Sequence, residues 1–454
     1  MTPDANDLCV FAVKRGDVNN RLDVKHSLYS KSKHNNSFGK VPLGELTDSE
    51  PCYGTSATAI ERISENQPKY IRITDFGDYG IEVDHKYMTA ESYCDKHLLR
   101  PNDILFARSG ATVGKTYYYD GSIGKAVFAG YCIRFRFDES KVDPKYVYWY
   151  TKTSFYKNWV NGIQRPSGQP NINKEEYKSL EIYCPKIAKQ RELVDFLDYA
   201  FSAWQSKKNE ADELLNEFEN KLTTRFKFQT QTKAKICFAV RYNDIDGVID
   251  VKRYSKIKNT QLNGLTVDDI CNIVGDKVNV QQWGNQVIDW IRIDDLPNKP
   301  LDIEEIRTQS ANEINGTFFE VQEGDILVAR LGPTIQNQKI VMVRSLKRTT
   351  IASAEFLVLR CKPGYAPEAI MAILKTAYYR DLMYSKARGS TPSRYRLNRE
   401  DLLKLPFPDI VGEQDLIAKQ AIETRNMVKK MRAEAELEWE AAKEQFEKEL
   451  LTEY

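Results

Sequence analysis

Segments of the first half of this 454-residue sequence recur in the second half, in the same order and 220 to 227 residues further along. Residues 11–31 and 238–256 share the groups FAV, DVK and YSK, and NDILFAR at 102–108 returns as GDILVAR at 324–330. Shared groups in one order at a nearly constant offset indicate an internal duplication. The period is far longer than that of a solenoid repeat, so each copy is predicted to be a whole domain.

A long helix is predicted at the end of each copy, over residues 190–226 and 413–451. Apolar residues recur there in steps of mostly three and four, which places them in one stripe on a helix. At 1.5 Å per residue the first helix would be about 55 Å long. Neither stripe can stay in water, so the two helices are predicted to pair. We assign partner binding to the stripe residues Leu193, Leu197, Trp204, Leu214, Phe218, Ile417, Val428, Met431 and Phe446.

The globular part of each copy has the pattern of an α+β domain. Short β-branched or aromatic stretches such as 103–108 and 127–137 predict strands, as do their counterparts 325–330 and 351–361. Residues 145–160 and 367–386 predict helices. We therefore divide the chain into a first globular domain at 1–188, a first long helix at 189–230, a second globular domain at 231–411 and a second long helix at 412–454.

The distribution of charge is more informative than the net charge of +2. Residues 433–454 contain eight Glu and two Lys, which makes this helix end a poor partner for phosphate. Any surface for nucleic acid is therefore expected on the globular domains. No apolar run is long enough for a membrane span or a signal peptide, so a cytoplasmic protein without membrane contact is expected.

Sequence motifs for catalysis or metal binding are absent. Eight Cys occur singly, without a C-x-x-C pair, which favours reduced thiols over a zinc site. Residues 110–116, GATVGKT, resemble a phosphate-binding loop, but three residues separate the glycines where that motif needs four. Asp103 and Asp325 are interpreted as turn residues that enter a strand. We expect no catalytic residue, no metal and no cofactor in this chain.

Two loops at equivalent places, 164–171 and 388–398, are the best candidates for DNA contact. They are rich in Arg, Gln and Asn, which read base edges, and in Ser and Thr, which suit phosphates. Weaker candidates lie around residues 53–56 and 277–282, and Arg108, Lys115 and Arg330 could reach a phosphate. The candidate DNA-binding residues are Tyr53, Thr55, Ser56, Arg108, Lys115, Arg165, Ser167, Gln169, Asn171, Lys277, Gln281, Arg330, Arg388, Ser390, Thr391, Arg394 and Arg396.

The order of these segments resembles the specificity subunit of type I restriction–modification enzymes. The first copy has NDILFARSGATVGK, a strand, a helix, a QPNI loop and QREL opening a long helix; the second has GDILVARLG, SRYRLN, LPFP and EQDLI. The single motifs are loose, and the duplicated order with two long helices makes the likeness specific. The resemblance covers nearly the whole chain.

The resemblance implies that each globular domain reads one half of a split target in double-stranded DNA. It implies that the long helices form an antiparallel coiled coil, which sets the gap between the halves and docks two adenine methyltransferase subunits. Those partners would bring S-adenosylmethionine, and a restriction subunit that translocates DNA would bring ATP and Mg. The chain would then be a pseudo-two-fold, non-catalytic member of a defence system against foreign DNA.

Two other functions remain open from the sequence. A coiled-coil scaffold whose domains bind proteins would show no salt-dependent affinity for DNA. A duplicated nucleotide-binding enzyme built on residues 110–116 would lose its ligand on Lys115→Ala. The second copy has no Gly-Lys in the equivalent stretch, which argues against the enzyme.

Overall fold

The computed structural model describes residues 39–81, 87–164, 170–228 and 264–452. The repeated segments 11–31 and 238–256 lie outside this part of the chain. The chain divides into two units: unit 1 comprises the residues up to 205 and those from 435 onward, and unit 2 comprises residues 206–434. Each unit therefore contains a globular domain and a portion of both long helices.

The central sheet of unit 1 has the strand order β2-β9-β6-β7, with all neighbours antiparallel. These strands span Cys52–Tyr53, Cys132–Phe135, Asp103–Ala107 and Thr116–Tyr119. Strand β6 is buried along its whole length, and its side chains alternate between the two faces of the sheet. Ile104 and Phe106 join the core shared with the helices, whereas Leu105 and Ala107 join a second core on the other face.

Three strand pairs complete unit 1. Strand β4 (Lys69–Ile71) is parallel to β8 (Ala126–Phe128), and β3 (Ala59–Glu61) is antiparallel to β5 (Met88–Ala90). The third pair joins β1 (Lys40–Pro42) to β10 (Glu181–Tyr183). The β1-β10 pair brings together strands from the two ends of the globular segment.

Unit 2 repeats this topology. Its central sheet has the order β12-β19-β16-β17 (Cys271–Ile273, Phe356–Cys361, Ile326–Ala329, Ile340–Met342). Strands β13 (Val287–Ile291) and β18 (Thr350–Ser353) form the parallel pair, here flanked by β14 (Arg307–Ser310) and β15 (Phe318–Glu320). Strands β11 (Leu265–Thr266) and β20 (Pro406–Phe407) close the domain. The predicted pair of similar α+β domains is confirmed.

Each predicted helix of the globular domains is in fact two helices. Residues 145–160 lie in α2 (Pro144–Tyr150) and α3 (Ser154–Ile163), and residues 367–386 lie in α9 (Pro367–Leu374) and α10 (Ala377–Lys386). Thr153 and Thr376 stand at the breaks, and each hydroxyl donates to the carbonyl three residues earlier, at 2.7 and 2.8 Å. Such local bonds compete with the helical pattern, which explains why both copies break at the same place.

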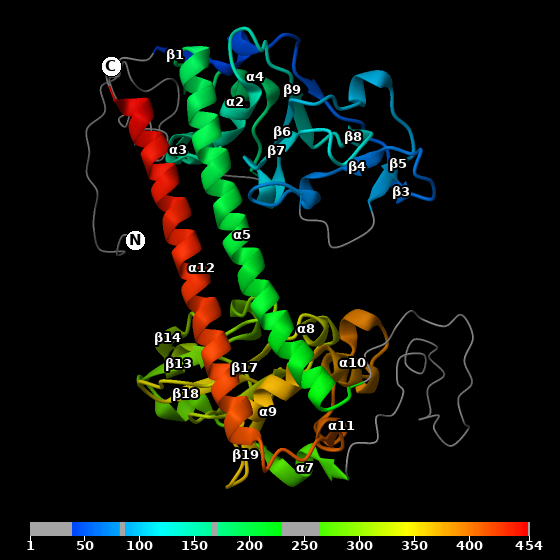
Figure 1. Cartoon of the computed structure of the whole chain (residues 1–454), viewed down its shortest axis with the longest axis vertical. Coiled ribbons are helices and arrows are strands. Elements are labelled where there is room, and N and C mark those ends of the chain that lie inside the picture. Colours follow the sequence, from blue (N-terminus) through cyan, green and yellow to red (C-terminus); the bar gives the residue numbers. More distant parts are fainter. Residues whose placement is uncertain (1–38, 82–86, 165–169, 229–263, 453–454) are drawn as a thin grey trace. The chain divides into compact units, whose positions relative to one another are not determined.

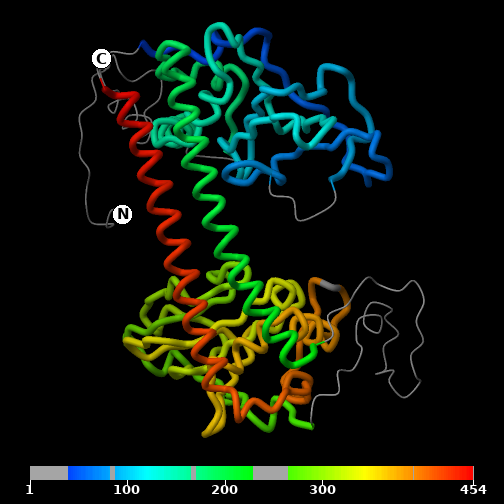
Figure 2. The backbone as a smooth tube through the Cα atoms, in the orientation of Figure 1, coloured from blue at the N-terminus to red at the C-terminus, as the bar shows by residue number. Residues whose placement is uncertain are grey.

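The long helices are α5 (Ile187–Arg225) and α12 (Gln414–Leu451) (Figures 1 and 2). In unit 1 the Lys189 ammonium lies 3.0 Å from Glu449, and in unit 2 the Arg225 guanidinium lies 2.7 Å from Glu413. Residue numbers rise along one helix as they fall along the other, so the pair is antiparallel, as predicted. Ala211 and Val428 are fully buried between the helices in unit 2.

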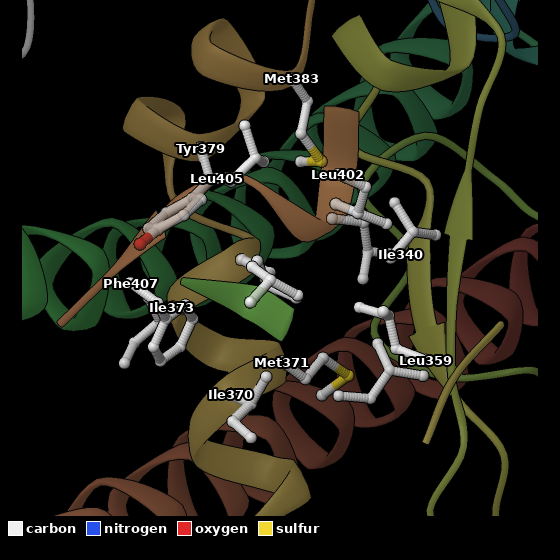
Figure 3. Packing of buried hydrophobic residues seen from close by; sticks show 14 of the residues in the cluster. Ile340, Leu359, Ile370, Met371, Ile373, Tyr379, Met383, Leu402, Leu405 and Phe407 are labelled. Carbon is white, nitrogen blue, oxygen red and sulfur yellow. The ribbon is translucent and has the colours of Figure 1, made fainter. Parts of the chain in front are cut away.

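The core of unit 2 lies where the sheet meets helix α9. Figure 3 shows Met371 of α9 next to Leu359 of the sheet, and Ile340 and Ile370 belong to the same core. Ile417 of α12 belongs to the same core. The remaining short helices are α4 (Lys174–Lys178), α7 (Val267–Ile270), α8 (Gly332–Gln336) and α11 (Arg399–Leu403), with 3-10 turns at Leu43–Leu46, Ile73–Asp75, Asp95–His97, Gly110–Thr112, Val280–Trp283, Ile293–Asp295, Ala311–Glu313 and Pro392–Arg394.

Candidate functional site

In unit 1 the chain beyond strand β6 meets the end of the first candidate loop. Ser109 forms a bridge with Asn171, and the Gly110 amide donates to the carbonyl of Pro170 at 3.1 Å. The Ile172 amide donates to the carbonyl of Arg108 at 2.8 Å. Two predicted contact residues, Arg108 and Asn171, are thus held side by side although they are far apart in the sequence.

The Arg108 side chain is oriented by an aromatic ring. Its guanidinium lies over the Tyr53 ring, 4.8 Å from the ring centre, and such a cation–π contact favours a fixed orientation. The Arg108 Nε is buried and has no hydrogen-bond partner in the described part of the chain. Gly54 permits this placement of Tyr53, because a Cβ at Gly54 would lie 2.2 Å from the Phe128 carbonyl oxygen.

A hollow of about 410 Å³ opens beside this arginine. It is lined by Arg108, Asn171 and Tyr131 among others, and the Tyr131 side chain is 62% exposed. The site thus combines a guanidinium, an amide and exposed aromatic surface, which are the groups that bind phosphates, base edges and base faces.

Unit 2 builds the same junction with other side chains. The Gly332 amide donates to the Tyr395 carbonyl at 2.7 Å, and the Leu397 amide donates to the Arg330 carbonyl at 2.8 Å. Arg330 is the counterpart of Arg108, and its Nε is likewise buried without a hydrogen-bond partner among the described residues. The backbone frame of the junction is therefore shared by both units.

The second loop closes as a hairpin, in which the Arg388 and Arg396 amides donate to each other's carbonyls at 3.0 and 2.8 Å. Carboxylates hold both guanidinium groups, because Arg396 lies 2.7 Å from Glu355 and Arg388 lies 3.6 Å from Asp401. The arginine at the hairpin tip is Arg394, which is exposed together with Ser390 and Thr391.

Other predicted residues occupy separate places. Thr55 is buried, and its hydroxyl donates to the Ser92 carbonyl at 3.1 Å, so its side chain serves the fold and we leave it out of the site. Ser56 is exposed beside it. Gln281 donates to Asn315 at 2.8 Å, away from the junction, and Lys277 is exposed on the same segment. Arg165, Ser167 and Gln169 lie outside the described residues.

The stretch 110–116 has the packing of a structural turn. A Cβ at Gly114 would lie 2.7 Å from Val160, and its φ is +86°, so glycine is needed for close approach of α3. Lys115 pairs with Asp78 at 3.0 Å, and the Thr116 hydroxyl bonds that of Thr151 at 2.6 Å. Gly114 and Thr116 are therefore used in packing, and because three residues separate the glycines where the motif needs four, this stretch does not fit a nucleotide-binding loop.

The residues assigned to partner binding are used within the chain. Leu193, Leu197, Phe446 and partly buried Trp204 belong to the core of unit 1, and Phe218, Ile417, Val428, Leu214 and Met431 pack in unit 2. The stripes are therefore occupied by packing within each unit, against the globular domain and the other long helix. The exposed apolar side chains of the helices are Phe196, Tyr199, Leu416, Met427 and Leu437, which sequence reasoning missed because they lie off the stripes.

Within the described residues, no three His, Cys, Asp or Glu side chains gather in a way that could hold a metal ion. The helices of the same residues include none that is both long and apolar enough to cross a membrane. Tyr131 is a further site residue that the sequence did not reveal. The only sequence signal for it is an aromatic residue between two predicted strands, at the position that Glu355 occupies in the second copy.

Comparison with known proteins gives one family and several relatives. Residues 37–216 match the family model of the type I restriction modification DNA specificity domain. Over 119 residues the chain is 25% identical to the specificity subunit of the type I restriction enzyme StySPI of Salmonella potsdam. This alignment covers 26% of the chain. Over the matched region the chain spans about a quarter (25%) of the length of that relative.

Two solved subunits resemble the chain along most of its length. The HsdS subunit of Thermoanaerobacter tengcongensis is 12% identical, with a TM-score of 0.35 and coverage of 93% of this chain and 99% of that one. The S subunit of a type I restriction–modification system of M. genitalium is 13% identical, with a TM-score of 0.40 and coverage of 93% and 98%.

Proposed function

We propose that this chain, which carries a type I restriction modification DNA specificity domain over residues 37–216, is the DNA-recognition subunit of a type I restriction–modification complex. The family match confirms the resemblance found in the sequence. In this proposal the chain catalyses nothing itself, and each unit reads one half of a split DNA target.

The observation that carries the proposal is that both units have the same backbone arrangement at the junction but surround it with different side chains. Arg108 and Arg330 occupy the same strand end and accept the same loop amide, from Ile172 and Leu397. Around Arg108 lie Tyr53 and Tyr131, whereas the junction of unit 2 has the Glu355–Arg396 ion pair. A shared frame with different surroundings suits two readers of different half-sites.

The chemistry of these groups matches direct reading of bases. A guanidinium can bond guanine O6 and N7 together, and an amide such as Asn171 can bond adenine N6 and N7. The Nε atoms of Arg108 and Arg330 are buried without a partner among the described residues, so in this proposal the terminal nitrogens of each guanidinium make the base contacts. Exposed Ser390, Thr391 and Arg394 would add contacts in the second half-site.

Partner subunits would dock on the helix pair and supply the chemistry. Tyr199 and Phe196 are 77% and 40% exposed and lie three residues apart on one face of α5, and Leu437 of α12 is 72% exposed. Exposed apolar residues of this kind fit protein contacts. We expect two adenine methyltransferase subunits with S-adenosylmethionine, and a restriction subunit that uses ATP and Mg.

The test is a genome-wide map of adenine methylation in cells that express the chain with its methyltransferase. A split motif that appears only with this chain is the expected result. Arg108→Ala should relax one half of the motif and Arg394→Ala the other, each by about 1–3 kcal/mol of discrimination at one position.

Two results would count against this proposal. Equal relaxation of both halves by either variant would contradict the two-reader arrangement. The absence of any new motif, with both proteins folded and expressed, would favour the coiled-coil scaffold, which the exposed apolar residues of the helices would also serve.

A further inference from the structure

A second hollow of unit 1, of about 390 Å³, gathers three lysines. Lys115 comes from the turn after β6, and Lys152 and Lys157 come from the break between α2 and α3 and from α3 itself. Asp78 is the one carboxylate among the residues that line it, and it lies 3.0 Å from Lys115. The hollow therefore carries a surplus of positive charge.

Lys152 is partly buried at this hollow, whereas Lys157 is exposed. Its ammonium donates to the Thr116 hydroxyl at 3.1 Å and lies 4.5 Å from the centre of the Tyr148 ring. Among the described residues it forms no ion pair, and burial lowers its pKa to about 7; the charge of Asp78 opposes this shift, and those of Lys115 and Lys157 add to it. A buried charge without a counterion is costly. An anion bound next to Lys152 would therefore stabilise its charged form.

The counterparts in unit 2 are engaged within the protein. The Lys339 ammonium donates to the Ile293 carbonyl at 3.1 Å, and that of Lys375 donates to the carbonyl of Pro300. Arg380, which takes the place of Lys157, pairs with Asp381 at 3.0 Å. Lys152 also donates to a backbone carbonyl, that of Thr116 at 3.4 Å, and it shares its hollow with two further lysines, Lys115 and Lys157.

The hollow adjoins the candidate recognition junction. Val113, Gly114 and Lys115 line it, while Arg108, Ser109 and Gly110 of the same segment line the hollow described above. Asn161, near the end of α3, also lines it and precedes the loop that returns at Pro170. A DNA strand read at Arg108 would have backbone phosphates close by.

We propose that the hollow of Lys115, Lys152 and Lys157 binds one phosphate group of the DNA backbone. This inference rests on the proposed function and adds the phosphate contact that positions unit 1. Ammonium groups act on phosphate as point charges without reading sequence. The site should therefore contribute affinity for all duplexes and leave the sequence preference unchanged.

The experiment measures binding of fluorescent duplexes to the full chain over a range of salt concentrations. Lys157 is exposed, so Lys157→Ala should keep the fold, which a thermal melt can verify. One phosphate contact accounts for a slope of about 0.9 in log affinity against log salt, so weakening it should reduce the slope by up to about that amount, equally for matched and unrelated duplexes. Lys157→Arg should restore the slope.

Lys141→Ala is the matched control, because Lys141 is a half-exposed lysine of the same unit that pairs with Asp138 at 3.6 Å. It should leave the slope unchanged. An unchanged slope in Lys157→Ala, with DNA binding intact, would overturn the phosphate site and leave the proposed function standing. A loss confined to one sequence would overturn it too, because that result indicates base reading.

Two further outcomes separate the sources of failure. If the unaltered chain shows no salt-dependent binding, the proposed function fails and this inference fails with it. Inorganic phosphate serves as the second probe. If it raises the melting temperature of the unaltered chain but not of Lys157→Ala, while the salt slopes agree, the site binds free phosphate and the DNA contact is refuted.

Discussion

Asp103 and Asp325 show how single residues hold the frame of each unit. Both carboxylates are buried, and each accepts two hydrogen bonds from one arginine, Arg136 directly after β9 or Arg360 in β19, at 2.7 to 2.9 Å. Each also accepts the amide three residues before it, from Arg100 or Gln322, at 2.8 Å. Their role is structural, in keeping with the turn residues expected from the sequence.

Replacing Asp103 by Asn should lower the free energy of unfolding of unit 1 by about 3 kcal/mol, because it leaves the Arg136 charge without its partner. Asp325→Asn should cost less, because the Arg360 side chain is 38% exposed and that of Arg136 only 18%. Urea unfolding followed by tryptophan fluorescence measures both. Equal losses would show that exposure of the arginine does not set the cost.

Lys152 makes the stability of unit 1 depend on pH. Its folded pKa of about 7 lies below the unfolded value near 10.5, so between these values the unfolded chain binds more protons, and stability rises with pH. The groups that face it are Asp78, Lys115 and Lys157, with the rings of Tyr79 and Tyr148.

Lys152→Met should therefore raise the melting temperature most near pH 7, and the gain should shrink as the pH approaches 10. Melting curves of variant and unaltered chain at matched ionic strength measure this difference. A gain that stays constant across the range would mean that Lys152 keeps its charge in the folded state.

At the scale of elements, periodic features were predictable and local ones were not. The long helices and the strand β6 follow from stripes and apolar runs that extend over many residues. The helix breaks at Thr153 and Thr376 depend on one hydroxyl bond each, which no periodicity reveals. The surroundings of Arg108 come from β2, from the turn before β9 and from the returning loop, so their meeting depends on the sheet order rather than on any motif.

Directly after strand β2, the backbone at Gly54 lies very close to that of Phe128. Gly54→Ala should destabilise unit 1 and weaken DNA binding, because the new methyl group would lie 2.2 Å from the Phe128 carbonyl oxygen and displace Tyr53 from Arg108. Gly39→Ala is the control, since nothing lies within 4 Å of a Cβ there. Melting temperature and duplex affinity are the measurements. An unaffected Gly54→Ala would mean that the strand can shift without cost.

At the scale of the whole molecule, unit 1 is assembled from two distant parts of the chain. Trp439, Phe446 and Leu450 of α12 are buried in the core that helix α2 and strand β6 also form. The Trp439 indole donates to the Tyr79 hydroxyl at 2.8 Å. The matched family segment, residues 37–216, thus lacks side chains that complete its own core.

Ending the chain after Glu434 should therefore damage the first globular domain rather than the second. We expect limited proteolysis to degrade residues 39–205 first, and the methylation map to lose the half-site read by unit 1. Trp439→Ala in the full chain should show the same order with a smaller effect, about 3–5 kcal/mol. Preferential loss of unit 2 would contradict the division of the chain into these units.

Because unit 1 consists of two segments that are far apart in the sequence, its core cannot be completed until the second segment has been synthesised. Its first part leaves the ribosome long before α12, and the interval for the residues between 205 and 435 is roughly 10–50 s at bacterial and eukaryotic elongation rates. During that interval the core around Leu193, Leu197 and Trp149 lacks the side chains that α12 contributes to it. A nascent chain that stops early would expose this incomplete core to chaperones and proteases. Only translation through α12 therefore completes the globular domain of unit 1.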